Sequence, residues 1–301
     1  MSCMPKPFLK WAGGKGQLLS QIEAMLPSNI ESAEFSYIEP FVGGGAMLFY
    51  MLQRYPNIKK VTINDINRRL IDAYRNIMSH PEILIAELSR IEAEYKSLSS
   101  EEAMKEYYLS MRRMFNTKEL DSVADTACLI FLNRTCFNGL YRENSKGDFN
   151  VPFGKNVNPQ ICNDELIMAN SELMNRFEVK ILCGDYTNVE DELDAGLNFI
   201  YFDPPYRPLS NTSSFNTYVK EPFNDDEQKR LCRFCHQLNE RDNCLWMLSN
   251  SDGKGKNPDD DFFDQLYADF TISRVWAKRS VNSNAEKRGK LTELLIHNYT
   301  K

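Results

Sequence analysis

The chain has 301 residues, 42% of them hydrophobic and 26% charged, and a formal net charge of −6 at pH 7. These values are ordinary for a globular protein, and the length allows one large domain or two modest ones with a sizeable core. No segment reaches about 18 consecutive apolar residues, so we expect neither a signal peptide nor a membrane span. The eight cysteines are scattered, and we expect free thiols in a cytoplasmic protein.

Positive charge is concentrated locally although the chain is acidic overall. Residues 1–19 carry three lysines and no acid, residues 134–155 carry four basic against two acidic side chains, and residues 278–290 carry five against one. A nucleic-acid-binding protein needs basic charge locally rather than over the whole chain. Each stretch could equally be an ordinary solvated loop, because charged runs usually are.

The first element is a glycine-rich loop over residues 7–16, which contains Trp11 and Lys15. Glycines there let the backbone approach a ligand closely. The spacing, and the residue after Gly-Lys, do not match a P-loop. Apolar residues at helical spacing then predict a helix over residues 18–26, which Pro27 ends.

A strand, a glycine turn and a helix follow over residues 35–53, as in nucleotide-binding doubly wound folds. The next strand, residues 60–64, ends at Asp65. That acid lies 20 residues after Gly45, near the place of a ribose-binding carboxylate. It could also cap the following helix, and both roles are compatible. Leu48 occupies the position of the last glycine of a dinucleotide fingerprint, which disfavours a nicotinamide enzyme.

The middle of the chain shows helical periodicity without strand signals, which indicates a helical insertion in an α/β domain. Helices are expected over residues 67–78, 81–96, 101–115 and 121–136. Residues 137–153 then alternate around a turn cluster at 144–148 and predict a β-hairpin. Its aromatic, asparagine and arginine side chains suit entry into a DNA groove, although a surface hairpin without a partner has the same pattern.

Strand signals return in the last part of the chain and bring the expected number of strands to seven. They cover residues 178–183, 197–202, 244–249, 270–277 and 292–299. A helix is expected near residues 224–240. Ser249–Ser251 end one of these strands and could touch a substrate or simply form a turn. The sequence therefore predicts an α/β fold.

The most informative stretch is Asp203-Pro204-Pro205-Tyr206, directly after the buried strand 197–202. Two prolines cannot continue a strand ladder, so the strand ends at the aspartate, on the side where open α/β sheets bind ligands. The carboxylate can accept a hydrogen bond from an amine, and the tyrosine ring can stack. Together they suit an amino-purine or amino-pyrimidine turned out of a base stack. A solvent-facing turn with a capping aspartate is the alternative.

Two further clusters could suggest a metal site, and we expect none. Cys232, Cys235 and His236 lie within one predicted helix without a second cysteine pair, so we interpret the cysteines as core residues. The acids at 259–261 follow Asn257-Pro258, and we interpret them as the first turn of a helix, where acids stabilise the dipole.

With these motifs placed, the sequence resembles the Dam-type (D12 class, alpha group) DNA adenine-N6 methyltransferases over about residues 5–300. The motifs stand in the family's order: Phe8–Lys15, Glu39–Gly45, Asn64-Asp65, Asn138–Arg142 with Phe149–Gly154, and Asp203–Tyr206. The resemblance implies a Rossmann-like, seven-stranded methyltransferase sheet. Residues 1–66 and 177–301 would form the catalytic domain, which binds S-adenosylmethionine, and residues 67–176 an inserted helical target-recognition domain with the hairpin near 137–153.

The resemblance also implies roles for single residues, with no metal. Expected cofactor contacts are Trp11, Lys15, Phe41, Gly43, Gly45, Asp65, Asp185, Tyr186 and Asp203. Expected catalytic residues are Asp203, Pro204, Pro205 and Tyr206. Hydrogen bonds from adenine N6 to the Asp203 carboxylate and the Pro204 carbonyl would localise the nitrogen lone pair, and Tyr206 would stack on the flipped base.

For recognition, the resemblance implies double-stranded DNA as partner and GATC as target. Expected DNA contacts are Lys10, Arg134, Asn138, Leu140, Arg142, Asn144 and Pro152. Arg142 would read a guanine, and Leu140 and Pro152 would offer apolar contact to a thymine methyl. A bacterial or phage enzyme in the cytoplasm, with a possible cognate restriction endonuclease, is the expected setting. An inactive DNA-binding protein, or a methyltransferase for RNA adenine or cytosine N4, is the alternative.

Overall fold

The structure is a computed structural model, and it describes residues 3–156, 158–207, 223–255, 257–277 and 291–300. The basic stretch 278–290 lies outside these described residues. Within them, every helix is too short or too polar to cross a lipid bilayer.

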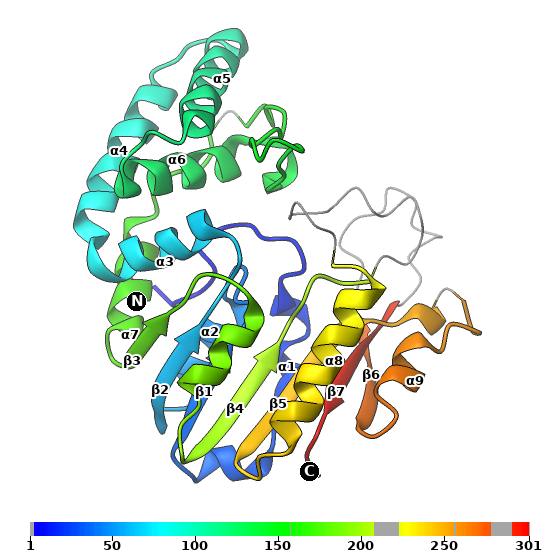
Figure 1. Ribbon diagram of the computed structural model, residues 1–301. Coiled ribbons are helices and arrows are strands. Elements are labelled where there is room, and N and C mark those ends of the chain that lie inside the picture. Colours follow the sequence, from blue (N-terminus) through cyan, green and yellow to red (C-terminus); the bar gives the residue numbers. More distant parts are fainter. Residues whose placement is uncertain (1–2, 157, 208–222, 256, 278–290, 301) are drawn as a thin grey trace.

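One mixed sheet of seven strands organises the described chain and confirms the predicted α/β class (Figure 1). The strands are β1 Phe35–Glu39, β2 Ile58–Ile63, β3 Glu178–Ile181, β4 Leu197–Phe202, β5 Cys244–Ser251, β6 Thr271–Ala277 and β7 Leu291–His297. Their order is β3-β2-β1-β4-β5-β7-β6, and β7 runs antiparallel to both neighbours while β1 to β5 pair in parallel. The order reverses between β1 and β4, which is where doubly wound sheets bind ligands.

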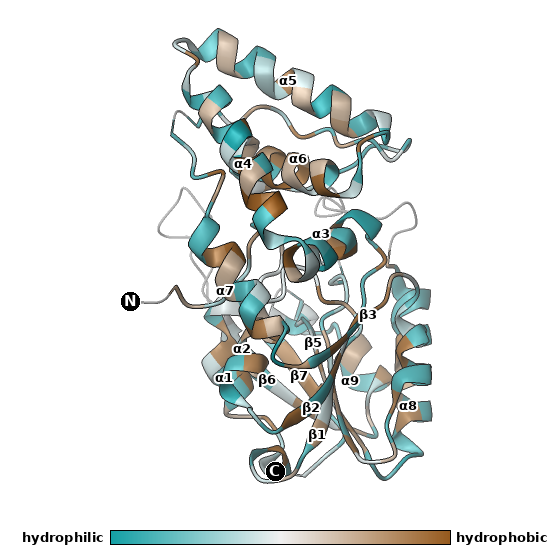
Figure 2. Cartoon of the chain, turned by 90° about the vertical axis from the view of Figure 1, so that its left-hand side faces the viewer, coloured by the Kyte–Doolittle hydropathy of each residue, from teal (hydrophilic) through white to brown (hydrophobic). Residues whose placement is uncertain are grey.

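Helices cover both faces of the sheet, as the side view in Figure 2 shows. The α-helices beside the sheet are α1 Leu19–Glu23, α2 Ala46–Arg54, α3 Arg68–Ser79, α7 Asp164–Met174, α8 Asp225–Asn239 and α9 Phe262–Leu266. Alternate residues of β4 explain the two layers. Phe199 and Tyr201 join the core under α1, α2, α3 and α7, whereas Ile200 and Phe202 join the core under α8 and α9.

Three more helices lie beyond α3, away from the sheet (Figure 1). They are α4 Pro81–Lys96, α5 Glu101–Thr117 and α6 Ser122–Thr135. α6 is buried along most of its length because α3, α4 and α5 all pack on it. α3 also packs on α7, so one core runs from the sheet into the helices. The four helices expected between residues 67 and 136 are confirmed to within two residues at each end.

Short 3₁₀ helices complete the described elements. They are η1 Lys15–Gln17, η2 Ser28–Glu31, η3 Phe137–Gly139, η4 Tyr186–Glu192 and η6 Gly253–Gly255. The single helix expected over residues 18–26 is wrong in extent, because α1 covers only five residues of that range and the turn before it is η1. The backbone N–H groups of Met25 and Leu26 bond three residues back, which tightens the last turn before Pro27.

The hairpin expected over residues 137–153 is present only as an antiparallel loop. Its pairing consists of two isolated bridges, Cys136 with Phe153 and Glu143 with Phe149. Regular strands cannot form at its start because Asn138 and Gly139 have φ of 56° and 65° and turn the chain into η3. We name residues 136–153 the recognition loop, after the DNA-recognition role that the sequence resemblance predicts for them.

Candidate active site at the carboxyl ends of the strands

Because β1, β2, β4 and β5 are parallel, the residues that follow their carboxyl ends meet at one edge of the sheet. This places Glu39, Asp65, Asp203 and Ser249 on the same edge. Two of these side chains are in direct contact. Ser249 Oγ donates a 3.1 Å hydrogen bond to Asp203 Oδ1, so the polar end of β5 is part of the site rather than a simple turn.

Lys15 forms an ion pair with the predicted catalytic carboxylate. Its Nζ lies 2.7 Å from Asp203 Oδ1 and donates a 2.9 Å hydrogen bond to the Gly13 carbonyl. The Lys15 side chain is 4% exposed, whereas that of Asp203 is 21% exposed. The lysine is therefore enclosed by the protein, and the carboxylate keeps part of its surface exposed to solvent.

Burial raises the pKa of Asp203 above its usual value. The positive charge of Lys15 and the hydroxyl of Ser249 act in the opposite direction because both stabilise the ionised form. This balance of burial and charge is typical of groups that take part in chemistry. The pKa of Asp203 is thus raised by burial, and Lys15 and Ser249 limit the rise.

The Tyr206 ring is held from two sides. Lys15 Nζ lies 4.4 Å from the ring centroid, within range of a cation–π interaction. The Tyr206 hydroxyl donates a 2.5 Å hydrogen bond to Glu293 Oε2 on β7. Glu293 was not among the predicted site residues, although a lone acid in an apolar strand could have suggested it. Pro204 is buried and Pro205 exposed in the same turn.

The glycine turn after β1 is shaped around Asp65 and Tyr74. Gly43 and Gly45 have φ of 49° and 75°, and a Cβ on Gly45 would lie 2.4 Å from the Tyr74 hydroxyl. That hydroxyl donates a 2.9 Å hydrogen bond to the Gly43 carbonyl. The Gly43 N–H donates to one Asp65 oxygen at 3.0 Å, and the Asn67 N–H donates to the other at 2.9 Å. Asp65 is therefore tied to the turn.

Asp65 does not cap the helix that follows it. The N-cap of α3 is Asn67, whose side chain accepts from the Leu70 N–H at 3.1 Å. The capping interpretation of Asp65 is therefore wrong, because its oxygens face backbone groups outside the helix. Burial raises its pKa, and the N–H groups of Asn67 and Gly43 oppose that shift.

Asp185 and Tyr186 begin η4, beside the end of β3. Both Asp185 oxygens accept hydrogen bonds of 2.8 Å from Arg230 on α8. The Tyr186 ring is 4% exposed, and its centroid lies 5.1 Å from that of Phe41. Two predicted cofactor residues, Phe41 and Tyr186, are thus adjacent. A third, Asp185, is held by Arg230, which the sequence analysis did not single out.

Trp11 links the glycine-rich loop to the recognition loop. Its ring stacks on that of Tyr141, with centroids 5.2 Å apart and planes at 29°. A Cβ on Gly43 would lie 3.1 Å from the Trp11 ring, so the same indole also contacts the glycine turn. Asn133 on α6 adds a second link, because its side chain pairs with the Lys10 backbone in both directions and donates to the Gly139 carbonyl of the recognition loop at 3.0 Å.

The predicted DNA contacts differ in how free their side chains are. Arg142 is exposed and donates from Nε to Asn150 Oδ1 at 2.7 Å. Asn138 and Pro152 are also exposed. Asn144 is occupied by its own turn, since Oδ1 accepts the backbone N–H groups two and four residues later at 2.9 and 3.1 Å.

The remaining expected contacts are partly enclosed. Leu140 is half-buried against the core. Arg134 donates to the Phe8 carbonyl at 2.8 Å, and with Lys10 it lines a polar hollow of about 280 Å³. Phe137, which the sequence analysis did not select, is 51% exposed in the recognition loop. An exposed aromatic ring beside asparagine and glycine would have been the signal.

Cys232 and Cys235 are buried in the core under α8, which confirms their interpretation as core residues. In the parts of the chain that the structure describes, there is no group of three or more His, Cys, Asp or Glu placed to hold a metal ion.

The chain is similar to several known DNA methyltransferases. A type II methyltransferase, M.MjaIII of Methanocaldococcus jannaschii, is 49% identical over 98% of this chain and 99% of its own length. M1.LlaDCHI of Lactococcus lactis is 38% identical over 98% of this chain and 95% of its own length. The DNA adenine methylase of Escherichia coli K12 is 30% identical over 96% of this chain and 94% of its own length.

The family model of the D12 class N6 adenine-specific DNA methyltransferases matches residues 11–281. That range includes the Lys15–Asp203 pair, Tyr206 and the recognition loop. The members of this family methylate N6 of adenine in DNA. The alternatives of an RNA or cytosine-N4 methyltransferase, or of an inactive binding protein, are thereby set aside. The chain belongs to the D12 class N6 adenine-specific DNA methyltransferases.

Proposed function

We propose that this enzyme transfers a methyl group from S-adenosylmethionine to N6 of an adenine turned out of double-stranded DNA, within the sequence GATC. The observation that carries the proposal is the Asp203 carboxylate. It is held by Lys15 and Ser249, its side chain is 21% exposed, and it is followed three residues later by an aromatic ring. An exocyclic amine that must be oriented beside a carboxylate fits this arrangement.

The residues at the edge of β1 and β2 suit the cofactor. Each Asp65 oxygen accepts one backbone N–H, which leaves a further lone pair on each for a ribose hydroxyl. Gly43 and Gly45 allow the positive φ of the turn, and the space where their Cβ atoms would lie is taken by Trp11 and Tyr74. Trp11 borders the same turn, and Lys15 supplies positive charge for a carboxylate at the methionine end. When bound, S-adenosylmethionine supplies a methyl group on an electron-poor sulfonium.

The adenine end of the cofactor would lie near Phe41, Tyr186 and Asp185. Phe41 and Tyr186 offer adjacent aromatic faces. Arg230 donates hydrogen bonds to both Asp185 oxygens and so orients the carboxylate. Burial alone would raise the pKa of Asp185, but the hydrogen bonds from Arg230 and Thr187 outweigh it, so the pKa is lowered. An ionised, oriented carboxylate suits an exocyclic amine.

The chemistry needs an adenine nitrogen that is more nucleophilic than in free adenine, where its lone pair is delocalised into the ring. Hydrogen bonds from the amine to the Asp203 carboxylate and to the Pro204 carbonyl keep the lone pair on nitrogen. Tyr206 stacks on the base and sets its plane, with Pro205 stiffening the turn. Lys15 and Ser249 hold Asp203 ionised and correctly oriented.

Recognition is assigned to residues 67–176, which include the recognition loop. Exposed Arg142 is suited to guanine O6 and N7, and Pro152 and Leu140 to a thymine methyl. Asn138 and Phe137 are exposed beside them at η3 and suit contact with bases. Asn144 shapes the turn, and the hollow with Lys10 and Arg134 is suited to the DNA backbone and adjacent bases.

The test is methyl transfer from labelled S-adenosylmethionine to unmethylated plasmid DNA, with every modified base mapped. Label at the adenine of GATC alone is the expected result. Label at another adenine-containing site would overturn the recognition proposal but keep the reaction. No label in DNA, with Asp203→Ala behaving like the wild type, would overturn the assignment of the site.

A role beside a restriction endonuclease of the same specificity is part of the proposal. Its support is that two relatives carry the name type II methyltransferase. Plasmid isolated from cells that express the enzyme should resist an endonuclease that cuts unmethylated GATC. Full cleavage of that plasmid, with methylation detected elsewhere, would contradict this role.

A further inference from the structure

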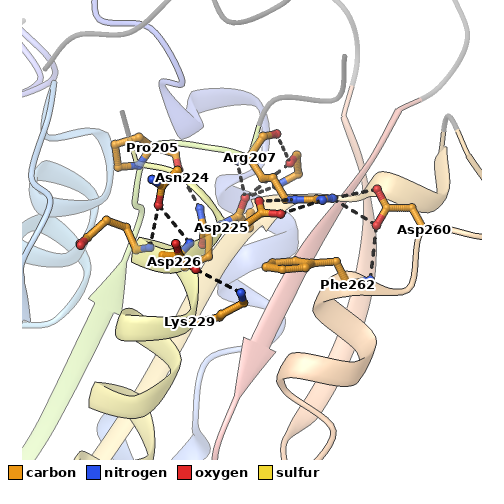
Figure 3. Close-up of polar contacts among 12 residues, drawn as sticks. Pro205, Arg207, Asn224, Asp225, Asp226, Lys229, Asp260 and Phe262 are labelled. Atoms are coloured by element: carbon orange, nitrogen blue, oxygen red, sulfur yellow. Dashed lines mark hydrogen bonds and ion pairs between the residues drawn. The ribbon is translucent and has the colours of Figure 1, made fainter. Parts of the chain in front are cut away.

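Arg207, the residue directly after Tyr206, lies between two acids (Figure 3). Its Nε and one terminal nitrogen donate to Asp225 at 2.7 and 3.1 Å. The other terminal nitrogen donates to the two oxygens of Asp260 at 2.9 and 3.2 Å. The guanidinium carbon lies 4.3 Å from the ring centroid of Phe262. One arginine thus joins the start of α8 to the start of α9.

The main chain around the arginine is held as well. The Arg207 N–H donates to Asn250 Oδ1 at 3.3 Å, and its carbonyl accepts from Ser251 Oγ at 2.9 Å. One residue before the tyrosine, the Pro205 carbonyl accepts from Gln228 Nε2 at 3.1 Å. Asn250 Nδ2 in turn donates to Gln228 Oε1 at 3.1 Å. The backbone is therefore fixed on both sides of the proposed base-stacking ring.

The two acids are themselves placed by local structure. Asp225 is the first residue of α8, whose N-cap Asn224 accepts two backbone N–H groups at 3.0 Å. Asp260 packs so closely on Gly253 that a Cβ there would lie 2.4 Å from the carboxylate. Asp260 keeps the helix-start role expected of residues 259–261, because its Oδ1 accepts the Phe262 N–H at 3.3 Å, and the same carboxylate also accepts from the guanidinium.

These contacts exclude the simplest role for an arginine in a DNA-binding enzyme, which is a phosphate contact. Nε and both terminal nitrogens are engaged by carboxylates, and two acids surround one positive charge. The local charge is therefore negative, which would repel phosphate. The hydrogen bond from Arg207 is the largest influence that lowers the pKa of Asp225, so the pair is ionised at neutral pH.

We infer that Arg207 is a positioning residue for methyl transfer, which holds Tyr206 at the angle needed to stack on the flipped adenine by tying the turn to α8 and α9. The inference rests on the proposed role of Tyr206. A displacement of about 1 Å at a positioning site can lower a rate about 100-fold. The ring would otherwise be restrained mainly by its hydroxyl contact to Glu293 and by Lys15.

The test compares Arg207→Met with Arg274→Met as a matched control. Arg274 also bridges two acids, with hydrogen bonds to Asp264 at 2.9 and 2.8 Å and to Asp252 at 3.0 Å. Its side chain is 33% exposed against 24% for Arg207. We measure the single-turnover rate constant, the Kd values for DNA and S-adenosylmethionine, the melting temperature, and the fluorescence of 2-aminopurine placed at the target adenine.

Arg207→Met should lower the rate constant about 10- to 100-fold and change the 2-aminopurine signal, with both Kd values within about twofold. Arg274→Met should keep the wild-type rate and signal. Arg207→Lys should give an intermediate rate, because lysine keeps the charge but not the two-sided hydrogen bonding. Asp225→Asn and Asp260→Asn should each lower the rate severalfold, and they carry the test if Arg207→Met does not fold.

A wild-type rate and signal in folded Arg207→Met, or in both asparagine variants, would overturn the inference and leave the arginine a purely structural residue. Tyr206→Ala separates this from a failure of the proposed function. If Tyr206→Ala also keeps the wild-type rate, the assignment of the stacking residue is wrong. If Tyr206→Ala is impaired and the Arg207 variants are not, only the positioning role fails.

Discussion

The site at the strand ends and the recognition loop each contain a basic side chain, but the two side chains differ in exposure and in the charge of their partners. In the site, Lys15 is 4% exposed, and its charge is matched by Asp203 at 2.7 Å. In the loop, Arg142 is exposed, and it donates hydrogen bonds to the neutral Asn150. A catalytic group must hold one geometry before the substrate arrives, whereas a base-reading group must be able to exchange its partner for DNA.

The two regions also differ in how the protein anchors them. The site is fastened to strands, so its groups are held by a sheet that is buried on both faces. The loop is fastened at its base by the Trp11–Tyr141 stack, while its tip is closed by the Asn144 turn. Rigid anchoring with an exposed rim lets the loop present arginine without burying it.

Removing the catalytic carboxylate should have the largest effect and should separate the two regions. Asp203→Ala leaves adenine N6 without its acceptor, so we expect methyl transfer to fall at least about 100- to 1,000-fold. DNA affinity should stay within about twofold, because the recognition loop is untouched. Labelled methyl transfer and fluorescence anisotropy with a DNA duplex measure the two quantities. Near-full turnover in this variant would refute the role of Asp203.

Removing the exposed Arg142 should affect DNA discrimination more than the rate of methyl transfer. Arg142→Ala should cost about 1–3 kcal/mol of discrimination at one guanine while the rate constant at saturating DNA changes less. The exposed Lys146 of the same loop provides the control, since Lys146→Ala should weaken binding to all sequences alike. The measurement is kcat/KM on duplexes with single substitutions in GATC. An unchanged ranking of these duplexes in Arg142→Ala would contradict the reading role.

The smallest expected effect is a change in pH dependence. Ser249 lowers the pKa of Asp203 by donating to its ionised form, while burial raises it. Ser249→Ala removes the lowering contribution, so the pKa should rise and the acid limb of the rate profile should move to higher pH. Rates measured between about pH 5 and pH 9 test this.

The matched control for the pH profile is Tyr201→Phe. The Tyr201 hydroxyl bonds Ser249 Oγ at 3.2 Å rather than the carboxylate, so its loss should shift the limb less. An acid limb at lower pH in Ser249→Ala would show that the serine does not stabilise the ionised Asp203.

The sequence determined the fold and the catalytic turn because both depend on local signals. Hydrophobic periodicity located all seven strands and the four middle helices, and two prolines marked the end of β4 at Asp203. Parallel strands then bring their carboxyl ends to one edge, so Asp65 and Asp203 could be placed on the same side before any contact was known.

Tertiary structure alone decided which side chains pair, because these partners lie far apart in sequence. Lys15 and Asp203 are 188 positions apart, and Tyr206 reaches Glu293, 87 positions later. Asp260 binds Arg207 in addition to the first N–H of α9, and left-handed residues at η3 prevent a regular hairpin. Sequence spacing fixes what a segment can become, but the packing of helices and loops over the sheet edge selects each hydrogen-bond partner.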